Sequence, residues 1–223
     1  MDDIRILCYG DSNTWGAMPY TLRRYPGKVR WTGILREELG TGWEVIEEGY
    51  NSRTTVFDDL AEGRLSGLTY FGPCCVSQSP LDLLILMLGT NDLKVRFGME
   101  AITSAQALQR YLDQLPVLPM DGGRPEVLLM APPRISPAYK RLPEYVANLG
   151  TDADRRSEGF GEAVKALAVK NGTHFLNAAD YAWPSDTDGV HLTEEGHRKL
   201  GIAVAEAVRK ILNGRRIQEE KNK

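Results

Sequence analysis

Five short runs of apolar residues recur along the chain, separated by segments in which apolar residues follow a helical period. The runs lie at 4–9, 43–47, 83–88, 127–131 and 173–176. The third and fourth runs are almost continuously apolar, which is typical of central strands buried on both faces of a sheet. The pattern therefore predicts five strands, two of them in the sheet interior.

Four segments carry apolar residues at helical spacing, at 31–39, 99–115, 159–170 and 193–212. The last opens with Thr193 as a candidate N-cap, followed by two glutamates. Because strands and helices alternate, the sequence predicts parallel strands joined by right-handed crossovers. We expect an α/β fold, a flavodoxin-like three-layer α/β/α sandwich with about five parallel strands. In such sheets, functional residues gather at the carboxyl ends of the strands.

The remaining long segments, 17–30, 58–79 and 132–154, are rich in proline, glycine and charged residues and are predicted to be loops. They lie within one domain, because a chain of 223 residues suits a single core. We expect one domain over 1–212, followed by a polar, frayed tail over 213–223.

Composition and charge narrow the function classes. The net charge of −3 argues against a nucleic-acid surface, which usually shows a basic stripe. No apolar run approaches the length of about 18 residues that a membrane-spanning helix needs. The first residues lack a basic region and a signal-peptide core, so we expect a cytoplasmic protein. No His, Cys or Asp cluster has ligand spacing, so neither metal nor cofactor is expected.

Three cysteines, Cys8, Cys74 and Cys75, form no obvious disulfide framework and indicate a reducing compartment. Cys8 lies in an apolar run and is predicted to be in the core. The adjacent Cys74 and Cys75 are either a redox-active pair or two small buried residues.

The loop after the first predicted strand reads GDSNTWG at 10–16. Ser12 therefore follows a buried strand and begins a helix, which exposes its hydroxyl at the functional edge of the sheet. Taken alone, a serine at a helix start is usually only a cap.

The loop after the third strand reads LGTND at 88–92. The side chain of Asn91 can donate an N–H to a developing oxyanion, and Asp92 can fix neighbouring backbone. The structural alternative is an Asx turn, which both residue types form readily.

The loop before the last helix reads DTDGVH at 186–191. Asp188 lies three residues before His191 in a loop with a glycine, so it can accept from one imidazole nitrogen while the other faces the cleft. The other histidines, His174 and His197, are expected to be structural or surface residues. Together, the three loops supply a nucleophile, an oriented base and an amide donor at one edge of the predicted sheet.

These three motifs resemble blocks one, three and five of the SGNH (GDSL-type) hydrolase superfamily, and 48–55 resembles block two. The stretches 29–33 and 45–49 are similar to the mycobacterial arylesterase/acyltransferase and to related rhizobial arylesterases. The resemblance covers nearly the whole chain. It implies Ser12 as nucleophile, His191 as base and Asp188 as the residue that supports it. It also implies an oxyanion hole formed by the Ser12 N–H, the Ser52 N–H and the Asn91 side chain, with Asp11 and Asp92 in supporting positions.

Two positions depart from the family pattern. Asn13 stands where many members have leucine, which should alter packing more than chemistry. Ser52 stands where glycine is usual, which affects the backbone geometry but keeps the amide donor. The resemblance also places Trp15, Lys94 and Val190 near the acyl or alcohol pocket.

The leading hypothesis is a serine ester hydrolase that acts on small esters through an acyl-enzyme and is able to transfer the acyl group to alcohols. The same machinery could instead act on thioesters, lysophospholipids or acetylated sugars. Thr14 replaces the second glycine of a Gly-x-Ser-x-Gly elbow, which argues against the larger α/β-hydrolase class. The non-enzymatic alternative is a flavodoxin-like module in which 11–16 cradles a phosphate, but it leaves Asp188 and His191 unexplained. The expected partner is a small ester rather than nucleic acid or membrane, and the oligomeric state stays open, a homo-oligomer included.

Overall fold

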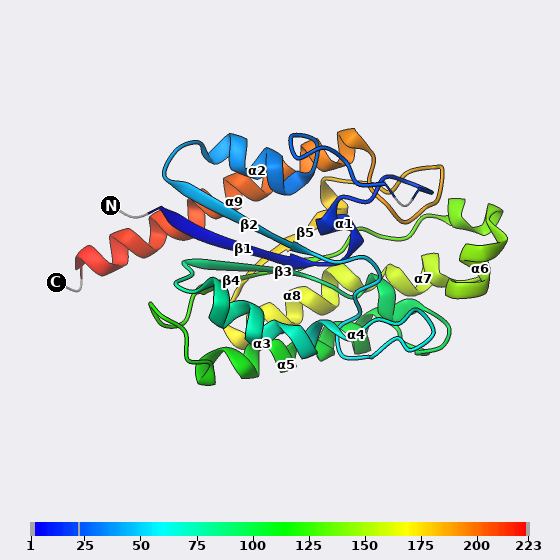
Figure 1. Cartoon of the computed structure of the whole chain (residues 1–223), viewed down its shortest axis with the longest axis horizontal. Coiled ribbons are helices and arrows are strands. Elements are labelled where there is room, and N and C mark those ends of the chain that lie inside the picture. Colours follow the sequence, from blue (N-terminus) through cyan, green and yellow to red (C-terminus); the bar gives the residue numbers. More distant parts are fainter. Residues whose placement is uncertain (1–2, 22, 222–223) are drawn as a thin grey trace.

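Each of the five predicted apolar runs forms a strand, and all of them join one parallel sheet (Figure 1). The computed structural model describes residues 3–21 and 23–221, with 214–221 described as backbone only. The strand order is β2-β1-β3-β4-β5, so β3 and β4 are interior, as predicted, and β1 is a third interior strand. The strands are β1 (Ile4–Gly10), β2 (Trp43–Gly49), β3 (Leu83–Met87), β4 (Glu126–Ala131) and β5 (His174–Asn177).

Helices cover both faces of the sheet, which confirms the predicted three-layer α/β fold (Figure 1). Alternate residues of β1 explain the two cores: Leu7 and Tyr9 pack into one cluster, and Ile6 and Cys8 into the other. One face carries α2 (Trp31–Leu39) and α9 (Glu194–Lys221). The other carries α3 (Gly67–Gln78), α4 (Ala101–Ala107), α5 (Gln109–Gln114) and α8 (Phe160–Asn171).

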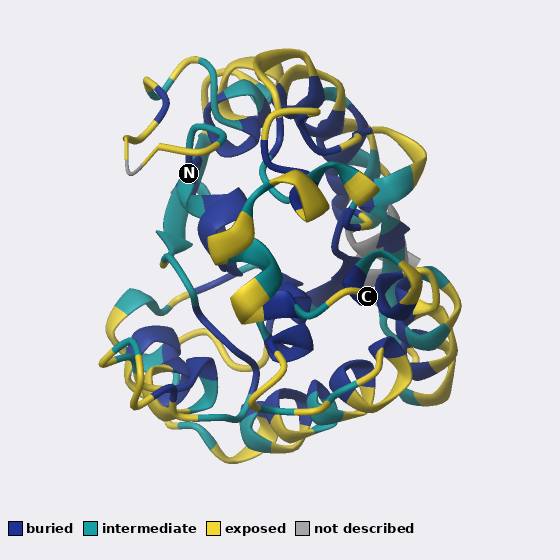
Figure 2. Cartoon of the chain, turned by 90° about the vertical axis from the view of Figure 1, so that its right-hand side faces the viewer, coloured by how far each residue is buried: buried dark blue, intermediate teal, exposed yellow. Residues whose placement is uncertain are grey.

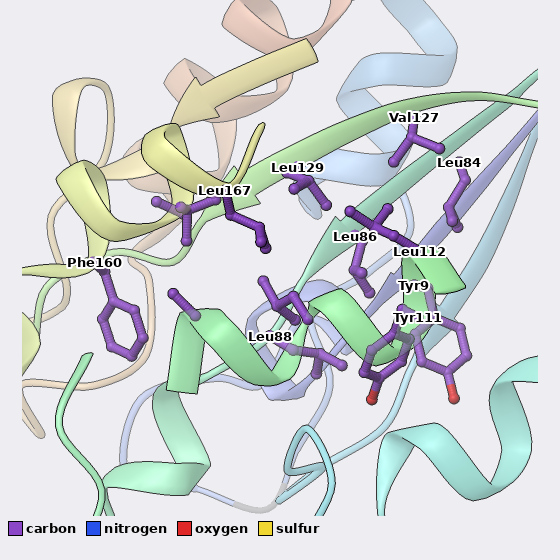
Figure 3. Packing of buried hydrophobic residues seen from close by; sticks show 14 of the residues in the cluster. Tyr9, Leu84, Leu86, Leu88, Tyr111, Leu112, Val127, Leu129, Phe160 and Leu167 are labelled. Carbon is purple, nitrogen blue, oxygen red and sulfur yellow. The ribbon is translucent and has the colours of Figure 1, made fainter. Parts of the chain in front are cut away.

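The larger core, whose packing Figure 3 shows, also anchors the segment that follows β2 through two tyrosine hydroxyls. The buried hydroxyl of Tyr9 donates to the carbonyl of Gly67 at 2.6 Å, and that of Tyr111 donates to the carbonyl of Thr55 at 2.6 Å. A buried phenol needs such a partner, because an unsatisfied hydroxyl loses its hydration without compensation. The two tyrosines therefore connect the core to the segment that carries Ser52.

The sequence prediction was wrong over 58–79, where α3 replaces the second half of the expected loop. Ser66 caps this helix by accepting from the amide of Thr69 at 3.4 Å. Pro73 lies inside the helix, and proline there usually breaks the helical pattern. Burial of Phe71, Cys74 and Cys75 against the sheet outweighs that preference.

The other differences concern segment length. The predicted helix over 99–115 is interrupted at Leu108 between α4 and α5. The predicted loop over 132–154 contains α6 (Pro143–Leu149) and the start of α7 (Ala153–Ser157), both too short to show a helical period. Helix α9 continues beyond 212 to Lys221, because 214–221 has one glycine and otherwise residues that tolerate helix well. The end of the expected tail, 222–223, lies outside the described residues, and its fraying stays a prediction.

Short helices complete the fold at the ends of strands and helices: α1 (Ser12–Trp15), η1 (Thr90–Leu93), η2 (Leu115–Val117), η3 (Pro137–Arg141) and η4 (Ala178–Asp180). Helix α1 follows β1 and η1 follows β3, and these two strands are neighbours in the sheet. From β1 the chain continues to β2 on one side, and from β3 it continues to β4 on the other side. Such a switch point opens a crevice at the carboxyl edge of a parallel sheet. Figure 2 views the molecule from that edge. No helix in the part of the chain that the structure describes is long and apolar enough to cross a membrane.

Candidate active site

Ser12 is held at the end of β1 by a tightly built turn. Asp11 caps α1 by accepting from the amide of Asn13 at 2.9 Å. Gly10 precedes it, and a Cβ there would lie 2.1 Å from Oγ1 of Thr14, so a larger residue would displace the helix. Ser12 is 7% exposed, and its side chain borders the cavity described below.

His191 joins Ser12 to Asp188 in a continuous chain of hydrogen bonds. Nδ1 of His191 lies 2.8 Å from Oδ2 of Asp188. A carboxylate only accepts, so Nδ1 carries the proton and donates to it. In the neutral ring Nε2 is then an acceptor, and it lies 3.0 Å from Oγ of Ser12. The structure thus brings Ser12 to the Asp188–His191 pair, although Ser12 and His191 are 179 positions apart in the sequence.

Backbone amides fix the carboxylate of Asp188 on every side. Oδ1 accepts from the amides of Val190 and His191, each at 3.0 Å. Oδ2 accepts from the amide of Tyr20 at 2.7 Å, in addition to the imidazole. Burial alone would raise the pKa of Asp188, but His191 and the amides outweigh it and lower that pKa to about 2. Asp188 is therefore an anion in any neutral buffer.

Asn13 connects the nucleophile loop to the histidine loop, a role that the sequence did not reveal. Its side-chain Nδ2 donates to the carbonyl of Val190 at 3.2 Å, and its Oδ1 accepts from the amide of Leu192 at 3.0 Å. These two groups flank His191 on both sides. Asn13, in place of the leucine common in the family, therefore does more than alter packing, because its side chain holds the backbone on both sides of His191. No periodicity signals such a contact across the fold.

The residues of the predicted oxyanion donors, Ser52 and Asn91, border the same cavity as Ser12. Ser52 has a left-handed backbone with φ 63°, which explains why glycine is common in the family at this position. Gly89 (φ 131°) lets the chain turn sharply after β3, and Asn91 follows on η1. Nδ2 of Asn91 donates to the carbonyl of Arg53 at 3.2 Å. Ser12, Ser52, Asn91 and His191 all border one cavity of about 290 Å³.

Asp92 stabilises this arrangement from the core side. Its carboxylate accepts from the amide of Thr55 at 2.8 Å, from the hydroxyl of Thr55 at 2.5 Å and from Oγ of Ser104 at 2.6 Å. Burial raises the pKa of Asp92 to about 6, and burial likewise raises the pKa of Asp11 to about 6. Both carboxyls are buried, and neither takes part in the hydrogen-bond chain from Ser12 to Asp188.

Of the three residues expected at the pocket, the structure places two there. Val190 and Lys94 border the cavity. Lys94 is almost fully buried, and its ammonium pairs with Asp59 at 3.0 Å and with Glu62 at 2.7 Å. Trp15 is not among the described residues that line the cavity; it packs instead beneath the guanidinium of Arg24, 5.2 Å from its ring.

The remaining titratable residues lie elsewhere. His197 is buried and accepts from the amide of Trp31 at 3.3 Å, and burial lowers its pKa to about 3. His174 pairs with Glu126 at 3.2 Å on the sheet edge. Cys74 and Cys75 are free and fully buried in α3, and burial raises the pKa of each thiol to about 12, which makes them poor nucleophiles. Within the described ranges, no three His, Cys, Asp or Glu side chains cluster as metal ligands do.

Fold and site together define an esterase-type hydrolase. The GDSL-like lipase/acylhydrolase family model matches residues 8–199. The chain belongs to this family, which confirms the resemblance seen in its motifs and favours a hydrolase over a phosphate-binding module.

Solved structures with the same fold share about a third of the sequence. The aryl esterase of M. smegmatis is 35% identical, with a TM-score of 0.87 over 93% of this chain and 99% of that one. A carbohydrate acetylesterase from Sinorhizobium meliloti is 35% identical, with a TM-score of 0.88 over 94% of this chain and 100% of that one. No curated protein sequence matches the chain significantly.

Proposed function

We propose that the chain is a serine carboxylester hydrolase in which Ser12 is the nucleophile, His191 the general base and Asp188 the group that orients the base. The observation that carries this proposal is the hydrogen-bond chain from Oγ of Ser12 through the imidazole to Asp188, with distances of 3.0 and 2.8 Å. A hydroxyl is a weak nucleophile until an adjacent base takes its proton, and this arrangement supplies that base in the correct tautomer.

The reaction has two halves. Nε2 of His191 takes the Oγ proton as Ser12 attacks the ester carbonyl carbon, and the carbonyl oxygen becomes an oxyanion. The amides of Ser12 and Ser52 and the side chain of Asn91 donate to that oxyanion. When the tetrahedral intermediate collapses, the proton on Nε2 passes to the leaving alkoxide, and the acyl group stays on Ser12. Water then repeats the sequence, with His191 as base, and releases the acid.

An alcohol that enters the cavity in place of water would accept the acyl group and form a new ester. The cavity is small for a ligand site, because pockets for drug-sized ligands usually measure about 300–1,000 Å³. Its 290 Å³ therefore favours esters of short acids over lipids. Acyl transfer would compete best with alcohols small enough to share that space with the acyl-enzyme.

Acetylated sugars are a second candidate substrate class. Several polar side chains on the cavity wall offer hydrogen bonds to hydroxyl groups: Asn51, Glu62, Glu144 and Asn148. One of the similar structures is a carbohydrate acetylesterase. An aryl leaving group would make little use of these polar groups, whereas a sugar would pair with them.

A panel of esters tests the proposal. We expect p-nitrophenyl acetate to be hydrolysed faster than p-nitrophenyl octanoate. Acetylated xylose is compared with phenyl acetate at equal concentration. Thioesters and lysophospholipids complete the panel. Ser12→Ala should lose about 10⁴–10⁶ in kcat, whereas the control Ser66→Ala, which removes the α3 cap, should lose stability but not turnover. Substantial turnover by Ser12→Ala would reject the assignment of the nucleophile.

A further inference from the structure

Arg53 is a buried arginine that the reaction steps above do not use. Only 5% of it is exposed, and it directly follows Ser52. Its guanidinium lies over the ring of Tyr9 at 4.2 Å and donates to backbone carbonyl groups. A buried charge is tolerated only where hydrogen bonds and a polarisable face replace its hydration. The fold therefore accepts the desolvation cost of a buried guanidinium at this position.

The first contact of Arg53 reaches the strand that carries the nucleophile. Nη1 donates to the carbonyl of Gly10 at 2.9 Å, two residues before Ser12. The same carbonyl accepts from the amide of Tyr50 at 3.1 Å. The backbone that precedes the nucleophile is thus fixed from the β2 loop by one charged and one neutral donor.

Two further contacts reach the other strand ends. Nη1 also donates to the carbonyl of Glu48 in β2. The carbonyl of Arg53 accepts from Nδ2 of Asn91 at 3.2 Å, which fixes the orientation of that amide after β3. The guanidinium of Arg53 thus contacts the ends of β1 and β2, and its backbone carbonyl contacts Asn91 on η1. Each of these places carries or adjoins one proposed oxyanion donor.

We infer that Arg53 is a positioning residue that sets the relative placement of the Ser12 amide, the Ser52 amide and the Asn91 side chain. The inference rests on the proposed ester hydrolysis. Arg53 acts through these donors and not on the substrate, since its guanidinium lies over the ring of Tyr9 and Arg53 is not among the described residues that line the cavity. Oxyanion donors must lie at 2.7–3.1 Å from the developing charge, and a misplacement of about 1 Å can cost about 100-fold in rate.

Steady-state kinetics of Arg53→Met and Arg53→Lys test this inference, with active sites counted by titration with a fluorophosphonate. Methionine keeps the stem but removes the donors, and lysine keeps the charge but not the planar fork. We expect kcat per titrated site to fall about 10- to 100-fold in Arg53→Met, less in Arg53→Lys, with KM changing far less than kcat. A residue that only stabilised the fold would lower the number of titrated sites instead.

Arg64→Met is the matched control. Arg64 lies over the ring of Tyr50 at 5.0 Å, as Arg53 does at 5.5 Å, and donates to its hydroxyl at 2.7 Å, but it bonds neither to Gly10 nor to Asn91. Its kcat per titrated site should equal that of the wild type.

A double-mutant cycle with Asn91→Ala identifies the route of the effect. If Arg53 acts through the oxyanion hole, Arg53→Met should cost much less in the Asn91→Ala background than in the wild type. Equal costs in the two backgrounds, or an unchanged kcat per site in both Arg53 variants, would overturn the inference. Should Arg53→Met fail to fold, a wild-type kcat in Arg53→Lys would overturn it. Turnover by Ser12→Ala in the same assay would instead reject the proposed function.

Discussion

Replacing Asp188 with asparagine removes one charge and places an amide NH₂ where the structure has an acceptor. Oδ1 faces two backbone amides, so the asparagine oxygen is held on that side. The new NH₂ then faces the N–H of Tyr20 and Nδ1 of His191. To accept from this NH₂, the imidazole must move its proton to Nε2, and Nε2 can then no longer take the proton of Ser12.

The magnitude follows from the same contacts. Lowering the pKa of Asp188 from 3.8 to about 2 corresponds to about 2 kcal/mol of stabilisation of the carboxylate at neutral pH. The N–H of Tyr20 left facing a donor adds about 1–3 kcal/mol. We therefore expect Asp188→Asn to unfold at lower urea concentration and to lose about 10⁴-fold in kcat, the typical effect of the wrong tautomer.

The pH dependence of stability has a defined sign. Because the pKa of Asp188 is lower in the folded than in the unfolded chain, its contribution is complete above about pH 4 and is lost as the pH falls through about 2. The difference in unfolding free energy between wild type and Asp188→Asn should therefore shrink below pH 4.

The assay compares kcat on p-nitrophenyl acetate and urea unfolding for Asp188→Asn and for Asp186→Asn, an exposed carboxylate in the same loop. The control should match the wild type in both measurements. A destabilised Asp188→Asn with kcat close to that of the wild type would show that Asp188 only caps its turn, and would remove it from the catalytic group.

Three further predictions address other residues. Asn91→Ala should lower kcat about 10²–10³-fold by removing one oxyanion donor; a raised KM at constant kcat would make it a substrate-binding residue instead. Asn13→Leu should leave a carbonyl and an amide beside His191 unpaired. We expect the free energy of unfolding to fall by about 1–3 kcal/mol per group and kcat per fluorophosphonate-titrated site to fall as well. An unchanged kcat would show that Asn13 does not position His191. The pKa of His197 is about 3 in the folded chain, below its ordinary value of about 6.5. Its neutral form therefore contributes fully to the free energy of unfolding above about pH 6.5, and this contribution is lost as the pH falls from 6.5 to 3. The loss is about 2 kcal/mol by pH 5. In urea unfolding, the difference in unfolding free energy between wild type and His197→Asn should therefore be about 2 kcal/mol smaller at pH 5 than at pH 7, and an unchanged difference would contradict it.

The sequence predicted the strands because each contains a short apolar run, and the runs at 83–88 and 127–131, which are almost continuously apolar, are buried on both faces. It predicted the loops that carry Ser12, Asn91 and His191 because each follows a strand or precedes a helix with a polar motif. Pattern alone could not reveal α3, where burial overrides Pro73.

Contacts between loops that are distant in the sequence could not be predicted from its pattern either. The amide of Tyr20 reaches Asp188 across 168 positions, and Asn13 reaches Leu192 across 179. Neither contact leaves a periodic signal, because a single backbone or amide group makes each of them. The contact of Trp15 with Arg24 could not be predicted for a similar reason: the family pattern gives the place of Trp15 in the chain, whereas this contact depends on a loop that the pattern does not describe.

The identity of the nucleophile is tested most directly by intact-mass spectrometry after incubation with a fluorophosphonate, followed by peptide mapping. The proposed function predicts one adduct per chain, located on Ser12, with loss of esterase activity in proportion to labelling and no adduct in Ser12→Ala. An adduct on another residue, or esterase activity that survives complete labelling of Ser12, would contradict it.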